Sequence, residues 1–410
     1  MKSVDRRVRR LIRHAYENVP YYRQHFDTHR IRPEDIRGAE DLSIIPVSSK
    51  QDLQRDASAF LARGSEATSL IRHTTSGSTG QPVAILNSVA EQHEVNVGRW
   101  RLAYYYGTRP GARAAWVAIT RPSLQLERRL LRLLTASRLY RQKRVSCLLP
   151  PTEILRQLRE FRPSSINGFP GVIAQVAQVA LEIGCTDLRP EYVGVGGEVL
   201  TPAMRKNIGE AFGAPVYDVY ASHELGVTAY QCRNGPTYHV RDDAVVTEIL
   251  ADGGPVAVGQ SGELIGTNLN AFTMPFIRYV IGDVVTRGPD CCTCGATSPT
   301  ITAIEGRALD YFRLPDGRTL HPFSFNLGLT PWIRNFSMVQ ERSDLITAYV
   351  VASSERTGDQ VSELEHSVRR VLGPRVSFRM QFVDTISPAP SGKFRPYRGL
   401  APQGSGGTDT

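Results

Sequence analysis

A run of hydroxyl and glycine residues near the start of the chain is the strongest local pattern for chemistry. It reads Thr74-Thr75-Ser76-Gly77-Ser78-Thr79-Gly80-Gln81-Pro82. The two glycines permit a tight backbone whose N–H groups point inward, and the five hydroxyls add donors, so the run suits a bound polyphosphate. It lacks the GxxxxGKS/T spacing of the usual P-loop, and a run of this composition alone is more often an ordinary turn.

Cysteines gather in the second half of the chain and predict a metal site. Cys232-x6-His239 and Cys292-x-Cys294 supply three thiolates and one imidazole, which is the closed tetrahedral shell of a structural Zn²⁺. Cys291 could replace Cys292, and free buried cysteines are the alternative interpretation. Because no secretion signal is evident, we expect no disulfide framework. A full shell leaves no open position, so we expect no catalytic role for the zinc.

Composition narrows the class of protein. A chain of 410 residues that is 41% hydrophobic can fill one large domain and a smaller one. No stretch approaches the roughly 20 apolar residues of a membrane span, and no apolar segment follows the basic N-terminus, so we expect no membrane partner and a cytoplasmic location.

The net charge of +9 comes mostly from scattered arginines, densest over residues 127–144. We interpret that stretch as a solvated helix face, which makes nucleic acid an unfavoured partner.

The order of apolar segments predicts the fold class. Helical and buried strand-like segments alternate from about residue 91 to 220, which is typical of a parallel sheet covered by helices. From about residue 238 the pattern is β-rich, and a small α+β segment follows Gly306. We expect an α/β protein with a large N-terminal domain (1–305) of mostly parallel sheets flanked by helices plus a β-rich subdomain, and a small mobile α+β C-terminal domain (306–402). Residues 403–410 are expected to form a disordered tail.

Further motifs follow the hydroxyl-rich run in a fixed order. They are Gly196-Gly197-Glu198, Tyr220-Ala221-Ser222-His223-Glu224, Arg278-Tyr279-Val280-Ile281-Gly282-Asp283, Gly306-Arg307 and Ser391-Gly392-Lys393. With TSGSTGxP, this series resembles the adenylate-forming ligase superfamily of acyl-CoA synthetases and adenylation domains. The segments HAYENVPYYRQHF, PEDIRGAEDLSIIPVSSKQDL and CCTCG resemble its phenylacetate-CoA ligase-like branch, over about residues 8–398.

The resemblance implies roles for single residues. Residues 75–80 (Thr75, Ser76, Gly77, Ser78, Thr79 and Gly80) match its phosphate-binding loop, and Gly197, Glu198 and Tyr220 match segments around adenine. Glu224 matches the acidic residue that holds Mg²⁺, Asp283 the acceptor of both ribose hydroxyls, and Arg307 an arginine near ribose and phosphates. Standing alone, these three would be a surface glutamate, a turn aspartate and a loop cation.

Lys393 matches the lysine that the family requires for adenylation. In SPAPSGKFRPYR it stands on a flexible segment, from which an ammonium group can approach a carboxylate and an α-phosphate together and neutralise developing charge. An exposed tail lysine is the alternative.

Two positions depart from the family pattern. His223 stands where relatives carry a small hydroxyl residue, and it could contact the α-phosphate, act as a base on an acceptor, or only support its neighbours, which we prefer. Leu309 replaces the aspartate that serves as pivot for domain rotation in many members. CoA as acceptor is therefore less strongly indicated than adenylation.

The resemblance thus predicts a two-step ligase that uses ATP and Mg²⁺. A small carboxylic acid, expected to be aromatic, becomes acyl-AMP with release of pyrophosphate, and an acceptor, CoA or a carrier thiol, then displaces AMP. An amide synthetase with an amine acceptor in a secondary-metabolic pathway is the alternative, and an inactive ligase-fold binding protein is a further one. A homodimer is a candidate assembly.

Overall fold

The computed structural model describes residues 2–65, 70–74, 83–119, 141–307, 312–320, 325, 327, 330, 332–353, 356–387 and 396–400. Most of the arginine-rich stretch and the predicted disordered tail lie outside these ranges. The chain divides into two compact units, residues 1–105 with 219–305 and residues 106–218 with 306–410.

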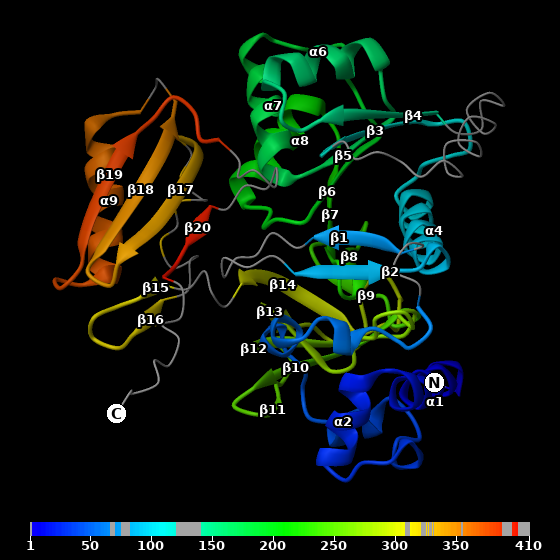
Figure 1. The fold of residues 1–410 in the computed structure, drawn as a ribbon. Coiled ribbons are helices and arrows are strands. Elements are labelled where there is room, and N and C mark those ends of the chain that lie inside the picture. The colour runs from blue at the N-terminus through cyan, green and yellow to red at the C-terminus, as the bar shows by residue number, and fades with distance from the viewer. Residues whose placement is uncertain are drawn as a thin grey trace. The chain divides into compact units, whose positions relative to one another are not determined.

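The first unit contains the N-terminal helices and an antiparallel sheet (Figure 1). Its helical elements are α1 (Lys2–Asn18), α2 (Pro20–Thr28), η1 (Pro33–Asp35), η2 (Glu40–Ile44), α3 (Lys50–Arg55), η3 (Ser58–Phe60) and α4 (Val89–Tyr105). Its strands are β1 (Ile71–Thr74), β2 (Ala84–Asn87), β8 (Gly226–Gln231), β9 (Tyr238–Val240), β10 (Val245–Ala251), β11 (Gly254–Pro255), β12 (Ser261–Asn268), β13 (Tyr279–Arg287) and β14 (Thr300–Arg307), together with the end of β7 (Val216–Ser222). Strands β1 and β2 form a separate antiparallel pair, and the others follow the order β11-β10-β12-β13-β14-β9-β8-β7.

Helix α1 illustrates why the N-terminal sequence folds as it does. Val8, Leu11, Ile12 and Ala15 recur at helical spacing, and all four are fully buried. Arginines occupy the opposite face, where Arg6, Arg9, Arg10 and Arg13 are exposed. Pro20 lies just after this helix and takes the first position of α2. Proline suits that position because the first residue of a helix needs no N–H donor. Truncating Leu11 to alanine would leave a cavity that costs about 2–5 kcal/mol.

The second unit begins with a parallel sheet of alternating strands and helices. Its elements up to residue 218 are β3 (Arg113–Ala118), β4 (Arg141–Ser146), α6 (Pro151–Phe161), β5 (Ser165–Gly168), α7 (Pro170–Glu182), β6 (Tyr192–Gly196), α8 (Pro202–Phe212) and the start of β7. The order is β4-β3-β5-β6, and all three pairings are parallel. Apolar residues of α6, α7 and α8 form one core with these strands. The predicted α/β class is confirmed.

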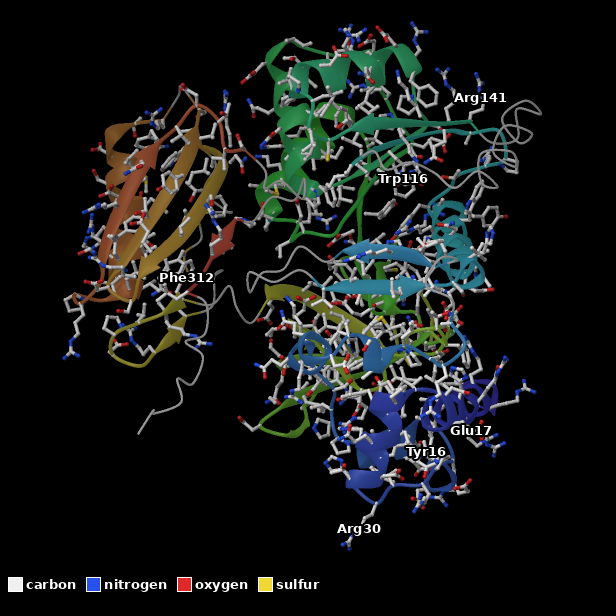
Figure 2. All side chains as sticks on the ribbon, viewed as in Figure 1. Tyr16, Glu17, Arg30, Trp116, Arg141 and Phe312 are labelled. Carbon is white, nitrogen blue, oxygen red and sulfur yellow. The ribbon has the colours of Figure 1, made fainter. Side chains whose placement is uncertain are left out.

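The rest of the second unit, after residue 306, has a hydrophobic core of its own. Its elements are β15 (Phe312–Arg313), β16 (Thr319–Leu320), β17 (Ile333–Arg342), β18 (Leu345–Ala352), α9 (Gly358–Leu372), β19 (Ser377–Phe382) and β20 (Tyr397–Arg398). The sheet order is β19-β18-β17-β20, and Thr357 begins α9 with a capping box to Gln360. Phe312, labelled in Figure 2, is buried in this core. Phe336 and Tyr397 are buried there too, and the described residues of this core all lie between 312 and 397.

Candidate functional site

Three predicted contacts to ATP are not part of the described structure. The predicted phosphate loop, residues 75–80, and Lys393 lie outside the described residues. Arg307 is the last residue of β14, and only its backbone is described. The roles assigned to these residues stay predictions.

Asp283 lies in an irregular part of β13. Between the pairs Glu263↔Val284 and Ile265↔Val280, β12 has one residue and β13 has three, so the β13 backbone bulges at Ile281-Gly282-Asp283. Gly282 has a φ of 81°, a conformation that residues with a Cβ adopt only with strain. The bulge takes the Asp283 carboxylate out of the regular strand alternation.

Tyr220 contacts this carboxylate directly. Its hydroxyl donates a 2.6 Å hydrogen bond to Oδ2 of Asp283, and the tyrosine is 8% exposed. On β12, burial and the nearby Asp283 carboxylate raise the pKa of Glu263. The structure thus brings together two residues predicted at the nucleotide, Tyr220 and Asp283, and adds Glu263, which the sequence analysis missed.

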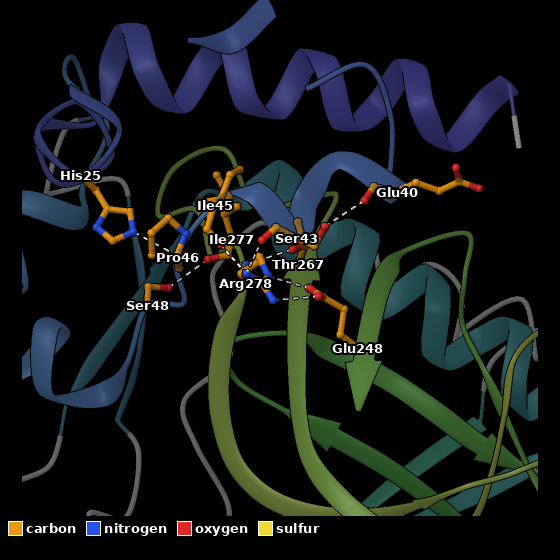
Figure 3. A network of polar contacts seen from close by, with 10 residues as sticks. All are labelled: His25, Glu40, Ser43, Ile45, Pro46, Ser48, Glu248, Thr267, Ile277 and Arg278. Atoms are coloured by element: carbon orange, nitrogen blue, oxygen red, sulfur yellow. Dashed lines mark hydrogen bonds and ion pairs between the residues drawn. The ribbon is translucent and has the colours of Figure 1, made fainter. Parts of the chain in front are cut away.

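The start of β13 is fixed by a buried arginine. Figure 3 shows the Arg278 guanidinium between Glu248 of β10 and the N-terminal segment before α3. It donates two 2.8 Å bonds to Glu248 and further bonds to the carbonyls of Ser43 and Ile45. Its backbone has a φ of 45°, a left-handed conformation that costs about 1 kcal/mol or more in a residue with a side chain. These contacts hold the segment that leads to Asp283.

His223 and Glu224 lie in the turn between β7 and β8. Ser222 Oγ accepts from the N–H of Leu225 at 3.0 Å, and Asn268 Nδ2 donates to the Glu224 carbonyl at 2.9 Å. Leu225 is buried against Gly266 of β12, where an added Cβ would come within 2.1 Å of a leucine methyl group. These contacts to β12 hold the backbone of the turn. The His223 side chain is exposed, and Glu224 is half-buried.

The His223 ring stacks on His73 of β1, a residue the sequence analysis missed. Their centroids are 5.0 Å apart, and their planes differ by 19°. His73 comes two residues before the predicted phosphate loop. No local pattern could have paired these histidines, because 149 residues lie between them in the sequence.

In the second unit, Glu198 contacts a helix N-terminus. One of its carboxylate oxygens accepts from the N–H of Gly171 at 3.0 Å, in the first turn of α7. A carboxylate there satisfies an N–H that has no partner within the helix and interacts favourably with the helix dipole. Gly197 before it is exposed, with a φ of 82°. Their predicted contacts to adenine are not tested by this geometry.

The four predicted zinc ligands converge in the first unit. One ligand atom from each of Cys232, His239, Cys292 and Cys294 lies within 4.8 Å of all the others. The sulfurs of Cys232 and Cys292 are 3.8 Å apart, and Cys294 Sγ is 3.4 Å from His239 Nε2. Burial lowers the pKa of His239, which favours the neutral imidazole that metals bind. Ser298 Oγ lies 3.3 Å from the other ring nitrogen and can orient the ring.

Geometry distinguishes the two adjacent cysteines. Cys292 belongs to the converging group of four, and Cys291 does not. Three thiols and one neutral imidazole fit the donor set and number of a structural Zn²⁺.

Comparison with known proteins identifies the family. The chain is 30% identical over 339 residues to the phenylacetate-coenzyme A ligase of Escherichia coli K12, covering 74% of this chain and 70% of that protein. The chain belongs to the phenylacetate-coenzyme A ligase family. The family member from Thermus thermophilus is 29% identical over 324 residues, covering 75% of this chain and 70% of the relative.

Other matches agree with membership of the phenylacetate-coenzyme A ligase family. Residues 324–397 match the CapK C-terminal domain. The solved structure of a 2-hydroxyisobutyryl-CoA ligase in the postadenylation state, in complex with R3-HIB-AMP, superposes with a TM-score of 0.80 at 22% identity, covering 97% of this chain and 89% of the other. The predicted branch and the prediction of a ligase enzyme are confirmed. Among the described residues, no helix has the length and apolar character needed to span a membrane.

Proposed function

We propose that this ligase joins a small carboxylic acid to AMP and then passes the acyl group to a thiol, CoA or a carrier thiol. The observation that carries the proposal is the Tyr220–Asp283 pair at the bulge of β13, because it presents an oriented carboxylate that can accept from two ribose hydroxyls. The acid is proposed to be aromatic because the relatives are named phenylacetate-coenzyme A ligases.

In the first half-reaction, a carboxylate oxygen of the acid bonds to the α-phosphorus of ATP, and pyrophosphate leaves with the electron pair of the broken bond. Two anions must meet, so positive charge and hydrogen-bond donors are needed at the phosphates. We assign the hydrogen-bond donors to residues 75–80 and the positive charge to Lys393. Mg²⁺ held by Glu224 would neutralise phosphate charge when bound. Gly197, Glu198 and Tyr220 are proposed to lie at adenine, and Arg307 at ribose and phosphates.

We also infer a structural Zn²⁺ at Cys232, His239, Cys292 and Cys294, with no part in acyl transfer. Residues 306–402 are proposed to form a lid domain that carries Lys393, and residues 1–305 a large domain that binds ATP and the acid. The separate core of residues 312–397 supports this division. A cytoplasmic location fits the proposed use of ATP and CoA.

Exchange of labelled pyrophosphate into ATP across a panel of carboxylic acids tests the first step. We expect exchange with at least one compact or aromatic acid and a loss of it in Lys393→Ala. Exchange with no acid, or exchange undiminished in Lys393→Ala, would reject the proposal. Adding CoA, a carrier protein or an amine to enzyme, acid and ATP then identifies the acceptor, and an amide product would replace the thiol proposal with the amine one.

A further inference from the structure

The stacked histidines connect two segments that the proposed function places at the phosphates of ATP. His73 is the third residue of β1 and pairs with Ile85 of β2, just before the predicted phosphate loop. His223 directly precedes Glu224, the proposed Mg²⁺ ligand. The near-parallel rings, 5.0 Å apart, therefore form a side-chain contact between β1 and the turn that carries the proposed metal ligand.

A chain of hydrogen bonds fixes the His73 ring. Its Nε2 lies 2.8 Å from Oε1 of Gln92, and the Gln92 amide nitrogen donates to Oδ1 of Asn96 at 3.3 Å. Since Gln92 uses its nitrogen toward Asn96, its oxygen faces His73, and Nε2 of His73 carries the donated proton. The His73 ring is thereby held by a residue of α4.

Gln92 is itself held in place at the start of α4. The neighbouring Glu91 accepts from the N–H and Oγ of Ser88 at 2.6 and 2.9 Å, which closes a cap on the helix. The other oxygen of Glu91 accepts from the N–H groups of Phe272 and Thr273 at 2.6 and 2.7 Å. A half-buried carboxylate with four donors leaves the first turn of α4 little freedom, and Gln92 lies in that turn.

We propose that His73 is a positioning residue. Its ring, held by Gln92, sets the orientation of the His223 ring and so places the adjacent Glu224 carboxylate for binding of Mg·ATP. This inference rests on the proposed function, because it gives Glu224 its task. The proposal gives His223 a stacking role. A variant with another aromatic ring at position 73 or 223 should therefore bind Mg·ATP more tightly than a variant with no ring there.

Equilibrium binding of Mg·ATP to the full chain, measured by calorimetry, tests the proposal without requiring turnover. His73→Ala and His223→Ala should each raise the dissociation constant about three- to tenfold, the range expected for loss of one aromatic pair. The double variant should be little worse than either single variant, because both remove the same contact. His73→Phe and His223→Phe should bind more tightly than the matching alanine variants. Gln92→Met should weaken binding, since it frees the His73 ring.

The control is His366→Ala, which removes an exposed imidazole from α9 and should leave binding unchanged. The melting temperature of each variant and the Mg²⁺ concentration that half-saturates ATP binding are measured together. A loosened fold lowers the melting temperature alone, whereas a misplaced Glu224 raises the Mg²⁺ concentration needed for half-saturation. Full additivity of the two alanine effects, or wild-type affinity in His73→Ala, would overturn the inference. Binding of Mg·ATP by the wild type without pyrophosphate exchange would overturn the proposed function alone, and no binding by the wild type would overturn both.

Discussion

The Tyr220 hydroxyl on β7 donates a 2.6 Å hydrogen bond to Oδ2 of Asp283 on β13. A donor held on one carboxylate oxygen fixes the plane of the carboxylate and stabilises its charged form. Both residues were predicted at the nucleotide from separate motifs 63 positions apart. Their contact gives the proposed ribose acceptor a defined orientation before ATP binds.

Loss of the Tyr220 hydroxyl should weaken ATP binding. Tyr220→Phe keeps the ring but removes a hydrogen bond to a charged group, a contribution of about 1.5–3 kcal/mol, so we expect the KM for ATP to rise about tenfold or more in pyrophosphate exchange. Tyr16→Phe is the matched control, because it also removes a tyrosine–aspartate bond, the 2.9 Å contact to Asp27, at an exposed position. Equal KM values in both variants would contradict the assigned role of Asp283.

Metal content should follow the four converging ligands. We expect about one zinc per chain by elemental analysis, because three thiolates and one imidazole make a closed tetrahedral shell. Cys292→Ser should lose the metal and lower the melting temperature, since the remaining ligands would no longer fill that shell. Cys291→Ser is the control and should retain the metal and the melting temperature, because Cys291 is not one of the four converging residues. Purified protein without zinc, or equal loss in the two variants, would reject the site.

Breaking the Arg278–Glu248 pair should destabilise the first unit strongly. The side chains of Arg278 and Glu248 are 9% and 22% exposed, so Glu248→Gln leaves a buried guanidinium without its counter-charge, at a cost of about 3–5 kcal/mol. The Arg342–Asp344 pair, 67% and 53% exposed, provides the comparison, and Asp344→Asn should cost less than about 1 kcal/mol. Urea denaturation measures both. Similar losses would mean that Arg278 does not anchor β13.

Glu263 should make stability depend on pH in a defined direction. The folded state raises its pKa above the ordinary 4.5, so it holds the proton more tightly than the unfolded chain does. The stability contributed by the protonated form is complete below about pH 4.5 and is lost as pH rises through the folded pKa. Glu263→Gln should therefore melt higher than wild type near pH 8, and the two should converge near pH 4.

The neighbouring carboxylate supplies a control for this pH dependence. In an Asp283→Asn background, Glu263→Gln should raise the melting temperature near pH 8 by less, because the Asp283 charge is one of the two causes of the raised pKa of Glu263. An equal rise in melting temperature in both backgrounds would leave burial as the only cause of the raised pKa. A Glu263→Gln variant less stable than wild type at pH 8 would contradict the prediction.

Much of the chain's architecture was readable from local patterns. The alternation around β3 to β7 predicted a parallel sheet because buried strands and amphipathic helices have different apolar periods. The ordered motifs at Gly197, Tyr220, Asp283 and Lys393 predicted the family because each has a fixed place in that series. The spacing of the cysteines and His239 predicted a converging group, since short loops bring paired ligands together, but it left Cys291 and Cys292 as alternatives. The fold brings Cys292 into the group.

Tertiary structure alone decided the contacts between distant segments. Nothing near His73 in the sequence indicates His223, and nothing near Arg278 indicates the carbonyls of Ser43 and Ile45. The first contact depends on how the separate β1–β2 pair packs against the β7–β8 turn, and the second on how the N-terminal segment packs beside the start of β13. The sequence by itself determined which groups are available for chemistry, and the fold determined which of them touch, because side-chain contacts across a sheet depend on a register that only the assembled core selects.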